Sequence, residues 1–255
     1  MSYQHFKYEK SDGIAYVTFD RMEKYNAVTR ETFSEIATIM DEIDKDDEVR
    51  VAILTSQGQK VFCAGIDIES FDFSGVGPAY DFMAECMSAF RSIEEIRKPV
   101  IAAVNGLALG FGVEIAFVCD ITIASENAVF GLTEIRHGML PAILVTRGLE
   151  MVSRKNVAYL AMTGDNIKAD EAKAIGLVNK VVPADELMNE AVAIANKVKR
   201  NSPLGLRTVK RVLNKNGDRH FKEAINYVVP LLASEDVKEG MNAFFQKRQP
   251  HFKGN

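Results

Sequence analysis

The stretch around which the chain is organised reads Lys98-Pro-Val-Ile-Ala-Ala-Val-Asn-Gly-Leu-Ala-Leu-Gly-Phe-Gly-Val-Glu-Ile-Ala-Phe-Val-Cys-Asp120. Its first part, Pro99–Val104, is a continuous run of β-branched and small apolar residues, typical of a strand that is buried on both faces. Three glycines follow, and an apolar run of helical character then occupies Val113–Val118. Glu114 lies inside this second run. Since a buried carboxylate without a partner is costly, strand, glycine turn, helix start and acid together indicate a catalytic site.

Composition and charge narrow the classes of function. Of the 255 residues, 47% are hydrophobic and 26% are charged, which is typical of a globular protein. The formal net charge of -4 argues against nucleic acid as the main partner. Three cysteines without metal-like spacing indicate a reducing compartment and no disulfide framework. The first residues resemble no targeting signal, and no apolar run approaches the roughly 20 residues that span a bilayer, so we expect a cytoplasmic protein without membrane association.

The order of predicted elements favours an α/β fold with a helical C-terminal layer. Strands and helices alternate at first, and only helices are predicted later. We therefore expect an α/β core at residues 1–185 and a helical region at residues 186–255. Strands are expected at residues 14–19, 49–55, 61–68, 99–104, 120–124, 128–130 and 177–182, a loop at 69–79, a largely helical stretch at 143–162, and helices at 32–43, 80–96, 113–118, 170–175, 185–200, 203–214, 219–233 and 235–247.

Several common chemistries find no support in the sequence. The glycines of the central stretch do not match the dinucleotide-binding fingerprint, and the chain contains no Gly-Lys-Ser/Thr phosphate loop. The four histidines are scattered, so no metal site is expected. Cys63 could act as a nucleophile, but a small residue at the end of a buried strand is the favoured interpretation.

Glu114 and Glu134 are the remaining candidates for catalysis. Taken alone, Glu114 is explained by the dipole of a helix start, and Glu134 by a solvated loop. Both, however, follow buried strands on glycine-flanked turns with apolar neighbours. Two carboxylates in one pocket would separate their pKa values, so that one stays ionised and one protonated near neutral pH. Such a pair can deprotonate a water and protonate a carbon in one cycle.

Four motifs make the sequence specific. They are Phe62-Cys-Ala-Gly-Ile-Asp-Ile68, Pro99-Val-Ile-Ala-Ala-Val-Asn-Gly106 with Gly110-Phe-Gly-Val-Glu114, Phe130-Gly-Leu-Thr-Glu134, and the tail from Ser234 to Phe252. In these motifs, and over the chain from about Ile14 onward, the sequence resembles the crotonase superfamily, also known as the enoyl-CoA hydratase/isomerase family.

The resemblance implies a fold, an assembly and a substrate class. The fold would be a crotonase-like spiral of ββα units with a C-terminal helical trimerisation region, assembled as a homotrimer or as a homohexamer made of two trimers. The substrate would be an acyl-CoA thioester, with coenzyme A as part of the substrate and no permanently bound cofactor. An oxyanion hole for the thioester oxygen would use the backbone N–H groups of Ile66 and Phe111. This suits the sequence, because Phe111 opens a helix with free N–H groups.

The two glutamates decide which activity the resemblance favours. In hydratases of this family, two glutamates flank the water that adds across the α,β double bond, and they match Glu114 and Glu134. Double-bond isomerases commonly keep only the second acid, so the pair favours an enoyl-CoA hydratase. A thioester hydrolase or an enoyl-CoA isomerase on the same scaffold is the alternative. A non-catalytic or RNA-binding relative is a more remote one, since that reading expects a basic surface or missing acids.

Two departures from the family pattern concern the acyl pocket. Typical hydratases have a glycine where Phe111 stands, and a glycine-rich turn where this chain has Ala142-Ile-Leu-Val-Thr146. If these side chains face the pocket, Phe111, Ala142 and Ile143 would reshape or narrow it. Ala142 would still offer its N–H to the water.

The resemblance also implies where coenzyme A binds. Its contacts would fall on the loop after the first strand, on the backbone near the Ala-Gly-x-Asp motif, and on C-terminal residues of a neighbouring subunit. The matching residues are Arg21, Lys24, Ala64, Ile66, Phe244 and Lys247. For Arg21 and Lys24, a solvated surface is an equally supported interpretation.

Overall fold

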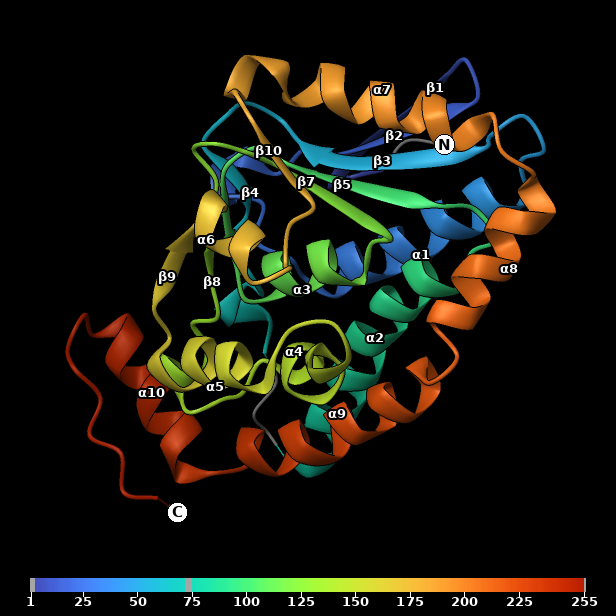
Figure 1. Cartoon of the computed structure of the whole chain (residues 1–255). Coiled ribbons are helices and arrows are strands. Elements are labelled where there is room, and N and C mark those ends of the chain that lie inside the picture. The colour runs from blue at the N-terminus through green and yellow to red at the C-terminus, as the bar shows by residue number, and fades with distance from the viewer. Residues whose placement is uncertain (1–2, 72–74, 255) are drawn as a thin grey trace.

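Two β-sheets form the centre of the molecule (Figure 1). The structure is a computed structural model that describes residues 3–71 and 75–254. Neighbouring strands are parallel except in the β1–β2 and β8–β9 pairs. In spatial order, the larger sheet contains β1 (Phe6–Ser11), β2 (Ile14–Phe19), β3 (Val51–Ser56), β5 (Val100–Val104), β7 (Ile121–Ser125) and β10 (Lys180–Val182), and the smaller sheet contains β4 (Val61–Cys63), β6 (Leu107–Leu109), β8 (Val129–Gly131) and β9 (Asn166–Lys168).

The chain advances through repeated units of two strands and a helix. β3, β4 and α2 (Val76–Glu95) form one unit, and β5, β6 and α3 (Phe111–Val118) form the next. The first strand of each unit joins the larger sheet and the second joins the smaller sheet, so successive units stack in parallel. This arrangement confirms the predicted α/β class and the spiral of ββα units.

Helices cover both faces of the larger sheet. Figure 1 shows α7 (Leu187–Lys199) on one face, with α1 (Arg30–Lys45), α2 and α3 on the other side. Alternate side chains of β3 accordingly enter two cores, with Leu54 in the larger core and Ile53 in the smaller core beside α7. All residues of β3 and β5 are buried. The uninterrupted apolar run in the sequence follows from this burial on both faces.

The remaining helices are α4 (Ala142–Thr146), α5 (Arg154–Thr163), α6 (Ala169–Ala174), α8 (Pro203–Leu213), α9 (Gly217–Leu232) and α10 (Glu235–Phe245). In the part of the chain that the structure describes, only helices follow residue 185, as predicted. The proposed boundary between a core and a helical region stays a prediction.

Residues 143–162 are largely helical, as predicted, and the structure divides them into separate helices. α4 ends at Thr146, a short 3-10 turn follows, and α5 begins after Ser153, whose hydroxyl accepts a hydrogen bond from the Asn156 N–H at 3.4 Å. A serine in this position favours a new helix start over a continuing helix. The predicted loop at 69–79 is also shorter than expected, since α2 begins at Val76; residues 72–74 lie outside the described residues.

The outer helices expose many large apolar side chains. Lys210 is the one buried residue of α8, and it donates to the Asp120 carboxylate at 2.7 Å. No helix among the described residues is long and apolar enough to cross a membrane. The exposed side chains of this layer include Leu204, Val209, Val212 and Leu213 on α8, Tyr227 on α9, and Phe244 and Phe245 on α10.

Candidate active site

A cavity of about 430 Å³ opens between the spiral and α10. Its lining comes from the loops after β2 and β4, from α2, from the start of α3, and from the 3-10 helix η3 (Glu134–His137). Exposed residues such as Lys24 and Glu69 line its mouth, and buried residues such as Met83, Met87 and Phe111 line its inner end. The cavity therefore has a charged entrance and an apolar interior, as small-molecule sites commonly do.

Two backbone N–H groups are free in this cavity. Among the described residues, neither the Ile66 N–H nor the Phe111 N–H donates a hydrogen bond. Gly65 brings the two segments together: a β-carbon at this residue would lie 3.2 Å from the Leu109 carbonyl oxygen and 4.0 Å from the Phe111 nitrogen. The positive φ of 99° at Gly65 also disfavours any other residue. The Phe111 N–H belongs to the first turn of α3, where backbone donors lack helical partners.

Glu114 is anchored by the start of α4. Glu114 is 5% exposed, and its Oε1 accepts hydrogen bonds from the N–H groups of Ile143 at 2.7 Å and Leu144 at 3.2 Å. Burial, followed by repulsion from Glu134, raises the pKa of Glu114 to about 8, although the two N–H donors oppose this rise.

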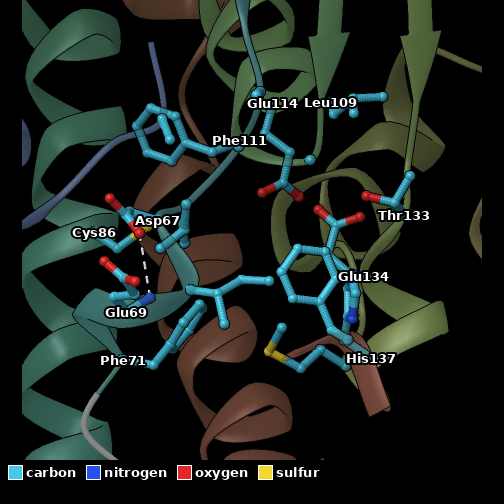
Figure 2. Close-up of a pocket in the computed structure, with 18 of the residues that line it drawn as sticks. Asp67, Glu69, Phe71, Cys86, Leu109, Phe111, Glu114, Thr133, Glu134 and His137 are labelled. Atoms are coloured by element: carbon cyan, nitrogen blue, oxygen red, sulfur yellow. Dashed lines mark hydrogen bonds between the residues drawn. The ribbon is translucent and has the colours of Figure 1, made fainter. Parts of the chain in front are cut away.

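Glu134 faces Glu114 from η3, and Figure 2 shows the two carboxylates pointing toward one another. The Oε2 atom of Glu134 is buried, and it has no hydrogen-bond partner within the described residues. Burial raises the pKa of this carboxyl to about 7. Gly110 leaves room for it, because a β-carbon at that residue would lie 2.9 Å from Glu134 Oε1.

Together these groups can exchange protons beside a hydrogen-bonding pocket for an oxyanion. Both carboxyls of the pair have raised pKa values, so the pair holds at least one proton near neutral pH and can also accept one. Free N–H groups at a helix start stabilise negative charge that develops on a nearby oxygen. Within the described residues, no group of three or more histidine, cysteine, aspartate or glutamate side chains is placed to hold a metal ion.

Comparison with known proteins identifies the family. The family model described as enoyl-CoA hydratase/isomerase matches residues 9–255. The chain belongs to the enoyl-CoA hydratase/isomerase family. This family member is 41% identical over 246 residues to a short-chain-enoyl-CoA hydratase of Clostridium acetobutylicum, with 94% of each chain covered. It is 37% identical over 257 residues to a crotonyl-CoA hydratase of Syntrophomonas wolfei, with 99% of each covered.

A solved structure agrees with this family assignment. The crystal structure of an enoyl-CoA hydratase from Mycobacterium avium subsp. paratuberculosis is similar with a TM-score of 0.88 and 29% identity. The similarity covers 99% of this chain and 100% of that one. The resemblance to the crotonase superfamily is thus confirmed for the sequence and for the fold.

Only some of the residues expected to bind coenzyme A line the cavity of this enoyl-CoA hydratase/isomerase family member. Lys24, Ala64 and Phe244 line the cavity. Arg21 is half-buried, and its guanidinium donates to the Asp67 carboxylate at 3.1 Å and to the Ala27 carbonyl at 2.8 Å. Lys247 follows α10 and is not among the residues that line the cavity.

The turn that differs from the family pattern forms the start of α4. Ala142 lines the cavity, whereas Ile143 and Leu144 are fully buried and do not line it. Their contribution to the site is through the backbone, since their N–H groups hold Glu114. Bulky side chains in this turn therefore do not narrow the cavity.

His137 is a polar cavity residue that sequence reasoning missed. It ends η3, three residues after Glu134, and its ring packs edge-on against Phe244 at 5.4 Å between centroids. Its Nδ1 is buried without a partner in the described structure, and burial lowers the pKa of the ring below its usual value. Its position beside Glu134 in the sequence was the available signal, but a histidine in a turn is by itself uninformative.

Proposed function

We propose that this protein is an enoyl-CoA hydratase, which adds water across the α,β double bond of an acyl-CoA thioester or catalyses the reverse reaction. The observation that carries the proposal is the facing pair Glu114–Glu134, which lies in one cavity with two backbone N–H groups that have no partner among the described residues. The family, and the hydratase names of the two similar proteins, support the same conclusion.

The proposed reaction uses the backbone and the two acids together. The N–H groups of Ile66 and Phe111 hold the thioester oxygen and stabilise the enolate that forms when water oxygen adds to the β-carbon. The ionised glutamate takes a proton from that water, and the protonated glutamate gives its proton to the α-carbon. The pair thus regains its original total of one proton. This cycle needs one proton on the pair, so kcat/KM should be highest between the pKa values of about 7 and about 8.

Substrate binding and assembly are further parts of the proposal. Lys24, Ala64 and Phe244 line the mouth of the cavity and would contact coenzyme A. Arg21 would act there through its ion pair with Asp67, next to Ile66. Lys247 would contact the coenzyme A part of a substrate that is bound to a neighbouring subunit. The exposed apolar side chains of α8, α9 and α10 support a homotrimer or a homohexamer, since such surfaces are commonly covered by a partner. A cytoplasmic location stays a prediction.

An assay with crotonyl-CoA tests the activity. Loss of enoyl absorbance without release of free thiol is the result expected for a hydratase, while thiol release would indicate a hydrolase and a shifted double bond an isomerase. Glu114→Gln and Glu134→Gln should each lower kcat at least about a hundredfold with little change in KM. Glu95→Gln, a change of an exposed acid on α2, is the matched control and should leave kcat unaltered. Near-normal hydration by either active-site variant would refute the assignment.

A further inference from the structure

The side chain of Phe111 forms part of the inner end of the cavity. The residue opens α3 and is 2% exposed. Its ring packs against Phe33 of α1 at 5.4 Å and against Phe90 of α2 at 4.5 Å between centroids, with tilts of 36° and 31°. These contacts with Phe33 and Phe90 fix the ring in place, because close-packed interiors leave little freedom for a large side chain.

Phe111 separates the cavity from this aromatic cluster. Phe111 lines the cavity, whereas Phe33 and Phe90 do not. The neighbouring lining residues from α2 are Met83, Cys86 and Met87, which are buried and at most weakly polar. In the view of Figure 2, the Phe111 ring lies on the far side of Glu114 from Glu134. A smaller residue here would extend the cavity toward Phe33 and Phe90.

The direction of the substrate follows from the two ends of the cavity. Coenzyme A is polar and charged, so it belongs at the mouth, where Lys24 and Glu69 are exposed. The acyl chain then points toward the buried apolar end. If the Phe111 N–H holds the thioester oxygen, the ring of the same residue lies within reach of the first acyl carbons beyond the double bond.

We propose that the Phe111 ring is the end wall of the acyl pocket and restricts this enzyme to short acyl chains. The inference rests on the proposed hydratase function and adds the substrate class. One residue then has two separable tasks: its backbone N–H stabilises the oxyanion, and its side chain sets the chain length. A side-chain substitution at residue 111 changes the second task and keeps the first.

A panel of straight-chain trans-2-enoyl-CoA thioesters with four, six, eight and ten carbons tests this proposal. The wild-type kcat/KM should fall at least tenfold between the four-carbon and the eight-carbon substrate, since excluding even one methylene from a closed pocket costs about tenfold or more. In Phe111→Ala the eight-carbon to four-carbon ratio of kcat/KM should rise at least tenfold, and in Phe111→Leu it should rise less.

Phe6→Leu is the matched control. It shortens a buried ring of another aromatic pair, Phe6–Phe19, and changes no residue that lines the cavity, so the ratio should stay at the wild-type value. Equal wild-type activity on four and ten carbons would overturn the proposal without any variant, as would an unchanged ratio in Phe111→Ala or an equal rise in Phe6→Leu. These outcomes differ from failure of the hydratase assignment, in which the wild type would hydrate none of the four substrates.

Discussion

Two pairs of ionisable side chains lie at opposite ends of α4, and they are built in opposite ways. At the C-terminal end, Arg147 forms an ion pair with Glu94 of α2, and both residues are buried. The Arg147 guanidinium also donates to the Asn214 side chain at 2.6 Å. At the N-terminal end, α4 holds Glu114, whose neighbour Glu134 is also an acid and has a buried Oε2 atom.

The difference separates a structural use of charge from a chemical one. Opposite charges balance one another in the Glu94–Arg147 pair, so neither side chain is left as an unpaired charge inside the protein. The Glu114–Glu134 pair has no cation to balance it among the residues that line the cavity near it, and burial raises both pKa values. A carboxyl that releases and regains its proton near neutral pH is useful to catalysis, whereas it contributes little to stability.

The largest effect is expected from breaking the opposite-charge pair. Arg147→Met should lower the free energy of unfolding by about 3–5 kcal/mol, because Glu94 is left as an unpaired buried charge. Urea denaturation measures this loss. The double variant Glu94→Leu/Arg147→Met should recover most of it, since two apolar residues leave no unpaired charge; equal stability of the single and double variants would show that the ion pair is unimportant.

A smaller effect is expected from titrating the like-charge pair. The folded-state pKa values of about 8 and about 7 lie above the ordinary glutamate value of 4.5. Between pH 4.5 and pH 8 the folded state binds more protons than the unfolded state, so the stability contributed by this pair falls as the pH rises from 5 to 8. We therefore expect a lower free energy of unfolding at pH 8 than at pH 5.

Glu134→Gln should reduce that loss, because it removes one of the two groups that must ionise in the cavity. The measurement is urea denaturation of both proteins at pH 5 and at pH 8. The variant should be the more stable protein at pH 8 despite its lost activity. If wild type and variant keep the same difference in stability at both pH values, the raised pKa values are not those of the folded protein.

The smallest effect is expected from Glu95, the direct neighbour of Glu94. Its carboxylate pairs with Arg91 at 2.8 Å on the exposed side of α2. Glu95→Gln should change the free energy of unfolding by less than about 0.5 kcal/mol, as exposed pairs one helical turn apart contribute little. Thermal melts of Glu95→Gln and Glu94→Gln compare the two neighbouring acids within one helix. If both substitutions lowered stability by a similar amount, burial would not be the factor that decides the size of the effect.

Local pattern predicted the parts of the fold that depend on neighbouring residues. The strand at Val100–Val104 and the helix that begins at Phe111 follow from apolar runs and glycine positions. β6 and β9 were not predicted, because strands of three residues are too short to show a period, and they form by pairing with distant strands. β1 was missed because its exposed residues are polar.

The residues of the site likewise divide into those that the local sequence predicted and those that depend on distant contacts. Glu114 and Glu134 could be singled out because a carboxylate within an apolar context is unusual. The ion pair of Glu94 with Arg147 joins residues far apart in the chain, and no local signal marks it. The position of the Phe111 ring likewise depends on Phe33 and Phe90, which belong to two other helices. Sequence reasoning identified Phe111 as an unusual residue, and the structure shows what its side chain contacts.

The two free N–H groups at Ile66 and Phe111 have a consequence for how such a protein can change. A main-chain donor is present whichever residue is encoded, with proline as the exception. Mutations at these two codons can therefore alter the shape of the cavity while the donors persist. A library randomised at residues 66 and 111 should keep many reactive members, and selection on longer or branched thioesters could then diversify the enzyme without rebuilding its chemistry.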